Sequence, residues 1–213
     1  SAEVALELMP GNKIRKYDTW HAMGQGATTG SLVVTLEALK EMHLTPEDIQ
    51  LIQNDTKTCP DTGMAGASRS LYMDGNATII AANKLLAAMR KEDGTLRTYD
   101  EMKAEGIETK YLGRYETNTT PGLCRLDPNT GIGDPTPAFT YCLNLAEVEV
   151  DTKTGKTTVL KFTCVDFVGR IGNIDAVNGQ AYSGIMHGIG FALKEDYADV
   201  KKHANMFGAG TSY

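Results

Sequence analysis

The chain has 213 residues, enough for one large domain or two small ones and for a substantial core. Hydrophobic residues make up 41% and charged residues 23%. No uninterrupted apolar run approaches the roughly 20 residues that span a bilayer, so we expect no membrane partner. The net charge of −6 also argues against a nucleic-acid partner, because phosphate backbones need a basic surface.

The four cysteines stand far apart and form no C-x-x-C pair: Cys59, Cys124, Cys142 and Cys164. Zinc and iron–sulfur sites usually need closer clusters, so this spacing predicts neither site within the chain and favours reduced, structural thiols. The first residues, SAEVALELMPGNK, lack a basic region followed by an apolar stretch and predict no signal peptide. We expect a cytoplasmic protein, with the periplasm left open.

The first part of the chain predicts a hairpin and then a helix. Residues 4–10 and 12–20 read as two strands around Pro10-Gly11-Asn12, a turn typical of hairpins. From residue 29 the leucines recur at helical spacing, at Leu32, Leu36 and Leu39. The segment LTPEDIQ, residues 44–50, predicts a helix-start turn before a short strand.

The rest of the chain adds further helices and a second hairpin. Residues 71–92 predict a long helix with Ile80, Leu85 and Met89 on its apolar side, and residues 98–106 predict a short one. A long loop is expected at 116–137 and a hairpin at 140–168. Strands and helices alternate irregularly, with antiparallel pairs. This order predicts an α+β fold with a mixed or antiparallel sheet and packed helices, not a doubly wound sheet.

Three segments place small residues at or near an expected helix start: GQG at 24–26, GMAGASRS at 63–70 and NGQAYSG at 178–184. Helix N-termini present unpaired N–H groups and a partial positive charge, and small residues let an anionic ligand reach that backbone. Each loop taken alone fits close helix–sheet packing equally well. The glycine spacing matches neither the G-x-G-x-x-G dinucleotide motif nor the G-x-x-x-x-G-K-[ST] phosphate loop.

The order of the motifs along the chain is more specific than any one of them. MGQG before a helix is followed by CPDTGMAGASRSLYMDG, AEVEVDTKTGKTTVLKFTCVDFVGRIGN and AVNGQAYSGIMHGIGFALKEDY. This series resembles the molybdenum-cofactor domain of the xanthine oxidase family, above all that of bacterial aldehyde oxidoreductases. The resemblance covers nearly the whole chain. It implies that residues 1–213 form the C-terminal half of a molybdopterin-binding domain, ending before the segment with the catalytic glutamate.

The resemblance also implies a set of cofactor-binding residues. These are His21, Gly24, Gln25, Gly26, Gly66, Ala67, Ser68, Ser70 and Gln180. It places Ala67 beside the molybdenum, where a larger side chain would crowd metal and substrate. It assigns Ser68 and Ser70 to the anionic end of the cofactor and Gln180 to the pterin, with which an amide can both donate and accept. It implies no catalytic residue and no metal ligand within the chain.

Enzymes of this family hydroxylate an aldehyde or a heterocycle with oxygen from water, and their electrons leave through [2Fe-2S] clusters. The resemblance therefore implies an oxidoreductase with molybdopterin cytosine dinucleotide, molybdenum and a small aldehyde substrate. The iron–sulfur domains, the rest of the cofactor domain and a glutamate base beyond Tyr213 would belong to other domains or subunits. We expect this chain alone to be inactive, and a homodimer of the whole enzyme is left open.

Other functions stay open at this point. One is a non-catalytic module that stores or passes on molybdopterin, and another is xanthine-dehydrogenase-type hydroxylation of N-heterocycles. A third is a structural α+β domain whose small-residue loops merely pack. Among the remaining polar residues, Asp61 and Asp74 are expected to be solvated or to cap helices, and His187 to pack within its helix. Trp20, the one tryptophan, is expected in the core.

Overall fold

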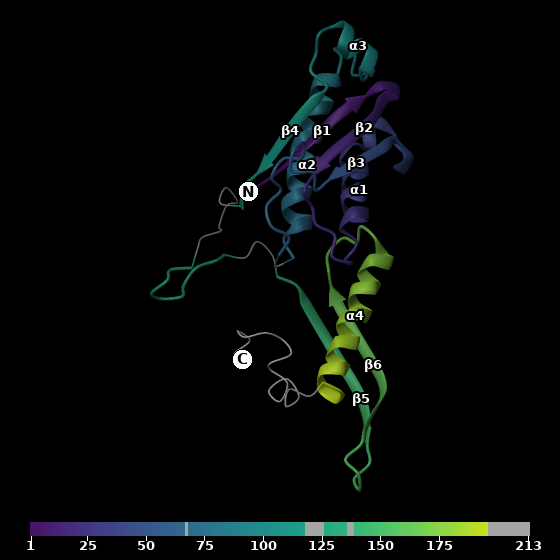
Figure 1. Cartoon of the computed structure of the whole chain (residues 1–213), viewed down its shortest axis with the longest axis vertical. Coiled ribbons are helices and arrows are strands. Elements are labelled where there is room, and N and C mark those ends of the chain that lie inside the picture. The colour runs from purple at the N-terminus through teal and green to yellow at the C-terminus, as the bar shows by residue number, and fades with distance from the viewer. Residues whose placement is uncertain (67, 118–125, 136–138, 196–213) are drawn as a thin grey trace. The chain divides into compact units, whose positions relative to one another are not determined.

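A computed structural model describes residues 1–66, 68–117, 126–135 and 139–195. The chain divides into two compact units, Ser1–Phe139 and Thr140–Tyr213. The first unit contains a four-stranded sheet with helices, and the second contains a two-stranded sheet and a helix (Figure 1). These mixed helices and open sheets confirm the predicted α+β fold. Within the described part of the chain, no helix is long and apolar enough to cross a membrane.

The sheet of the first unit has the strand order β3-β2-β1-β4. Its strands are β1 (Ala2–Met9), β2 (Lys13–Asp18), β3 (Ile49–Gln53) and β4 (Lys110–Tyr115). β1 pairs antiparallel with β2 and β4, whereas β2 and β3 are parallel, so the sheet is mixed. The predicted hairpin is confirmed at the turn η1 (Pro10–Asn12). Gly11 and Asn12 adopt φ angles of 73° and 57° there, a left-handed conformation that these two residue types tolerate.

Two long helices follow the predicted pattern. α1 spans Ala27–Ala38 and α2 spans Ser70–Met89; α2 packs against β1, β4 and α1. Short helical turns lie at η2 (Lys40–Met42) and η3 (Pro46–Asp48), and the predicted short helix is α3 (Tyr99–Ala104). The strand β4 was not predicted. The predicted loop at 116–137 is described only at 116–117 and 126–135, where there is no strand or α-helix.

The apolar core of the first unit joins the sheet to α2. Its fully buried members include Leu6, Leu8, Ile14, Leu39, Leu85 and Met102. Of the residues predicted on the apolar side of α2, Leu85 and Met89 are buried and Ile80 is half-buried. Among the leucines at helical spacing, Leu39 is buried, whereas Leu32 and Leu36 are half-buried. The buried residues of α1 are Ala27, Ser31 and Thr35. The predicted row of leucines therefore lies beside the buried face of α1 and not on it.

The second unit contains the predicted hairpin and one long helix. β5 (Tyr141–Val150) and β6 (Thr157–Phe167) pair antiparallel, and α4 spans Ile174–Leu193. The expectation that the segment 178–184 stands at a helix start is wrong, because α4 begins earlier. Asn173 caps it, since its side-chain oxygen accepts a hydrogen bond of 3.0 Å from the Ala176 N–H. Gln180 therefore lies inside α4.

Candidate functional site

Two of the three small-residue segments are tied together in the first unit. One loop runs from the end of β2 through Gly24–Gly26 into α1, and the other leads through 63–70 into α2. Thr19 and Thr62 join the loops reciprocally. The Thr19 N–H donates to Thr62 Oγ1 at 2.8 Å, and the Thr62 N–H donates to Thr19 Oγ1 at 2.9 Å. The Thr62 hydroxyl also donates to the Glu3 carbonyl at 3.0 Å, which anchors both loops to β1.

The GQG triplet forms a tight loop that its own glutamine closes. Gly24 and Gly26 have φ angles of 95° and 83°, a region that favours glycine. The Gln25 amide donates from Nε2 to the His21 carbonyl at 2.9 Å, and its Oε1 accepts from the Met23 N–H. Gln25 is half-buried, whereas Gly24 and Gly26 are exposed. The glutamine shapes the loop, and the glycines expose its backbone.

Both helices that follow these loops begin without a side-chain cap. Gly26 stands at the N-cap of α1 and Arg69 at the N-cap of α2, and neither makes a capping hydrogen bond from its side chain. A helix start without a side-chain cap relies on backbone, water or ligand acceptors for its first N–H groups, and the helix dipole favours an anion there. Helix starts of this kind can bind an anionic group.

The other predicted site residues are placed as follows. His21 and Ser68 are exposed, and Gly66 and Ser70 are half-buried; Ser68 has a φ angle of 54°. Ala67 lies outside the described residues. Gln180 is exposed on α4 of the second unit. His187, on the same helix, is exposed, so its predicted packing is wrong. The described residues contain no group of three His, Cys, Asp or Glu that could hold a metal ion.

Sequence reasoning missed a buried cluster of charges next to these loops. Lys16, Asp18 and Asp74, here called the ion cluster, are fully buried. Lys16 Nζ lies 2.8 Å from Asp74 Oδ1 and 3.2 Å from Asp18 Oδ2. The expectation that Asp74 is solvated or a cap is therefore wrong, because α2 turns this residue into the core. The available signal was alternation along β2, where Ile14, Lys16 and Asp18 share the buried face.

Neighbouring side chains complete the surroundings of the ion cluster. Asp18 accepts hydrogen bonds from Ser31 Oγ at 2.6 Å and from Gln53 Nε2 at 2.8 Å. Trp20 is buried, as predicted, and its ring centroid lies 5.8 Å from Lys16 Nζ. The absence of a side chain at Gly30 admits the ring, since a Cβ there would stand 3.3 Å from Trp20. The cluster thus links β2 and β3 to α1 and α2.

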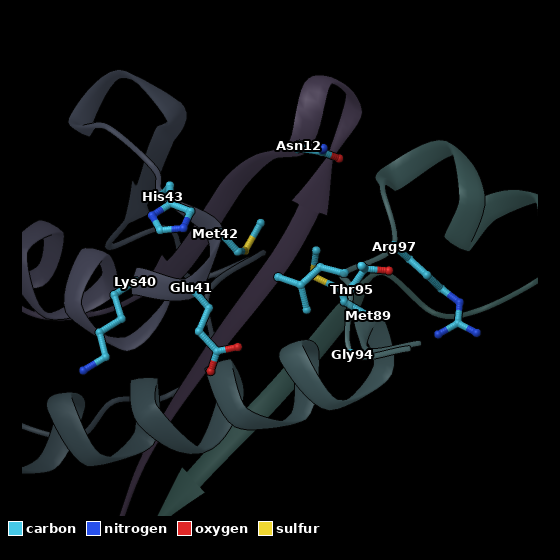
Figure 2. A pocket seen from close by; sticks show the side chains of 10 residues that line it. Asn12, Lys40, Glu41, Met42, His43, Met89, Gly94, Thr95 and Arg97 are labelled. Carbon is cyan, nitrogen blue, oxygen red and sulfur yellow. The ribbon is translucent and has the colours of Figure 1, made fainter. Parts of the chain in front are cut away.

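A separate hollow of about 770 Å³ lies elsewhere in the first unit. Figure 2 shows its lining, which comes from the hairpin turn at Asn12, the segment 40–43, Met89 and the segment 94–97. Its charged residues are engaged by neighbours: Glu41 pairs with Arg90, and Arg97 Nε donates to Glu105 at 2.8 Å. Its lining includes none of the predicted cofactor-binding residues, and we assign it no function.

Comparison with known proteins gives the same family from sequence and from structure. Residues 1–211 match the family model of the molybdopterin cofactor-binding domain. Aldehyde oxidoreductase from Megalodesulfovibrio gigas is 40% identical over 210 residues, which cover 99% of this chain and 23% of that protein. The structure of aldehyde oxidoreductase from Desulfovibrio desulfuricans matches with a TM-score of 0.88 at 43% identity. That match covers 98% of this chain and 22% of the other.

More distant relatives include xanthine dehydrogenase from Dictyostelium discoideum. It is 25% identical over 179 residues, covering 82% of this chain and 13% of the relative. The chain spans less than a quarter of the length of the aldehyde oxidoreductases it matches. The relatives are oxidoreductases of the aldehyde oxidoreductase and xanthine dehydrogenase type. On the match over nearly its whole length, this chain belongs to the family of molybdopterin cofactor-binding domains.

Proposed function

We propose that this chain holds molybdopterin cytosine dinucleotide within a molybdenum hydroxylase that oxidises aldehydes to carboxylic acids. The observation that carries the proposal is the pair of glycine-rich loops, joined by Thr19 and Thr62, that lead into two uncapped helices. Their backbone N–H groups bind the anionic end of the cofactor. Gly24 and Gly26 keep side chains away from this backbone, and Gln25 holds the loop in shape.

Each remaining predicted residue has a proposed task. Ser68 and Ser70 offer hydroxyl and N–H groups to the phosphates, with His21 as a neighbour. Gly66 and Ala67 are small residues that leave space beside the metal, and Gln180 hydrogen-bonds the pterin. When bound, the molybdenum cofactor supplies the two-electron oxidation of the substrate carbon, with oxygen from water. The residues of this chain bind and orient the cofactor, and a glutamate from another part of the enzyme serves as the base.

An aldehyde is favoured over an N-heterocycle as the substrate. Two aldehyde oxidoreductases match at 40% and 43% identity, whereas the xanthine dehydrogenase of Dictyostelium discoideum matches at 25%. We propose that the rest of the enzyme supplies the [2Fe-2S] clusters and the remaining walls of the cofactor site. Relatives such as the carbon monoxide dehydrogenase large chain and the gamma subunit of 6-hydroxypseudooxynicotine dehydrogenase are named as parts of multi-chain enzymes, which supports such partners.

The role of Gln180 is tested by replacing it with alanine in the complete enzyme. Because its side chain is exposed on α4, Gln180→Ala should leave folding unchanged while removing a hydrogen bond to the cofactor, worth about 0.5–1.5 kcal/mol. We expect a lower content of molybdenum and cytidine nucleotide, measured after acid denaturation. Asn178→Ala is the matched control, since residues two apart on a helix point about 200° apart. Equal cofactor content in both variants would contradict the assignment.

A further inference from the structure

The charges of the ion cluster do not balance if both carboxyl groups are ionised. It holds one ammonium group, on Lys16, against the carboxyl groups of Asp18 and Asp74, and all three side chains are fully buried. Such a cluster would bury a net charge of −1, which a low-dielectric interior strongly disfavours. One proton retained by a carboxyl group makes the cluster neutral.

The hydrogen bonds identify Asp74 as the residue that holds this proton. Both oxygens of Asp18 accept hydrogen bonds, from Gln53 and from Ser31. Asp74 Oδ1 accepts from Lys16 Nζ at 2.8 Å and from Thr78 Oγ1 at 3.3 Å. Asp74 Oδ2 is buried and has no hydrogen-bond partner among the described residues. A proton on Asp74 Oδ2 displaces no hydrogen-bond donor. A proton on either oxygen of Asp18 would displace Gln53 or Ser31 as the donor to that oxygen.

The electrostatic surroundings agree with this assignment. Burial raises the pKa of the Asp74 carboxyl, Lys16 opposes the shift, and the charge of Asp18 adds to it. From the other elements packed on α2, the buried residues carry no charge. They are Ala2, Val4, Ala5, Leu6 and Leu8 on β1, Ala27, Ser31 and Thr35 on α1, and Gly113 on β4. The charged residues of β4, Lys110 and Arg114, are exposed.

The position of the cluster relates it to the two loops. Asp18 is the last residue of β2, directly before the loop that carries Gly24–Gly26, and it also binds Ser31 of α1. Asp74 lies close to the start of α2, directly after the loop at 63–70. Lys16 bridges the two aspartates, so it links the backbone that leads into α1 with the first turns of α2.

We propose that Lys16 and Asp74 are positioning residues for the two cofactor loops, with a proton on Asp74 Oδ2 that keeps the ion cluster neutral. The identity of the ligand rests on the proposed function, whereas the cluster rests on the described side chains. Lys16 holds Asp18 on one side and Asp74 on the other, and thereby sets the spacing of the uncapped starts of α1 and α2. A dinucleotide bound to both helix starts requires that spacing to be constant.

The test compares three variants of the complete protein. Asp74→Asn keeps the size of a neutral carboxyl group, Lys16→Met keeps the alkyl stem and removes the ammonium group, and Lys40→Met is the control. Lys40 is 72% exposed and pairs with Glu37 at the surface, where an ion pair contributes little. We expect Lys16→Met to lower molybdenum and nucleotide content by about tenfold, Asp74→Asn by no more than about twofold, and Lys40→Met not at all.

A pH profile supplies a readout that a purely structural role would not move. A carboxyl group whose pKa is raised by folding stabilises the folded state below its unfolded pKa of about 3.9, and this stability is lost as pH rises through the folded pKa. We therefore compare hydrogen-exchange protection of the α2 amides in the wild type and in Asp74→Asn at a series of pH values. Protection of the wild type relative to the variant should decline as pH rises. Infrared spectra at neutral pH should contain a protonated carboxylic-acid band that Asp74→Asn removes.

The outcomes separate this proposal from the proposed function. If Asp74→Asn loses as much cofactor and α2 protection as Lys16→Met, Asp74 is an ionised partner and the proposal is overturned. Parallel pH profiles in the wild type and Asp74→Asn would also overturn it. If the wild-type complete protein holds no molybdenum, the proposed function fails, while the exchange profiles and the infrared band still decide the state of Asp74. If Lys16→Met does not fold, the comparison of the wild type with Asp74→Asn still decides whether Asp74 is protonated.

Discussion

Gly113→Ala should detach α2 from the sheet and give one of the largest stability losses of any single substitution in this chain. Gly113 is buried on β4, and a Cβ built there would clash with the Ala77 carbonyl oxygen and stand 2.6 Å from the Ala81 nitrogen. Both atoms belong to the α2 backbone, so no side-chain rotation relieves the clash. We expect a loss of at least about 3 kcal/mol, the upper end for overpacking, in the free energy of opening of α2.

Hydrogen exchange of the α2 amides in the complete protein measures this loss. The matched control is Gly75→Ala on α2, where a new Cβ would meet only Val34 at an ordinary 3.8 Å. Alanine favours a helix over glycine, so this control should gain about 0.5–1 kcal/mol. Unchanged protection of α2 in Gly113→Ala would show that the helix does not lie against β4 as described.

When residues 1–213 are expressed alone, the first unit should fold, whereas the amides of the second unit should show little protection from hydrogen exchange. No residue is buried in the described part of the second unit, 140–195. One face of its hairpin presents Tyr141, Leu143 and Leu145 at 72%, 60% and 54% exposure. An isolated two-stranded hairpin is marginally stable in water, and an apolar patch of this kind needs a covering surface. We expect rapid amide exchange in β5, β6 and α4, and slow exchange in β1, β2 and α2.

The complete protein provides the comparison for this experiment. There, β5 and β6 should become protected, since we propose that other parts of the enzyme cover the apolar face. Leu143→Asp should abolish this protection, whereas Asn144→Asp should preserve it, because neighbouring residues of a strand point to opposite faces. Slow exchange of the hairpin in the isolated chain would contradict the prediction and show that the second unit is stable by itself.

Local signals in the sequence were sufficient for most of the elements. The turn residues Pro10–Asn12 predicted the first hairpin, and the capping pattern from Thr98 to Glu101 accompanies the predicted short helix α3. Features that depend on distant partners were missed. Gly113 of β4 is required because the α2 backbone leaves no room for a Cβ there. Asp74 is buried because it pairs with Lys16, which lies 58 residues away in the chain.

In the candidate site, too, local features could be predicted from the sequence, and contacts between distant residues could not. The motif order singled out the two small-residue loops, in which Gly24, Gly26 and Gly63 adopt positive φ angles that favour glycine. The hydrogen bonds by which Thr19 and Thr62 join the loops depend on pairing over 43 residues, which no local pattern reveals. The start of α4 was misplaced because small residues at 178–184 outweighed the capping residue Asn173 in the prediction.

The composition of the complete native protein decides whether this chain holds a molybdopterin dinucleotide. Metal analysis should find molybdenum, and acid denaturation should release cytidine nucleotide in an equal amount. Both should fall together in Gln180→Ala and remain in Asn178→Ala. A correctly folded complete protein that contains neither molybdenum nor a released nucleotide would contradict the proposed function.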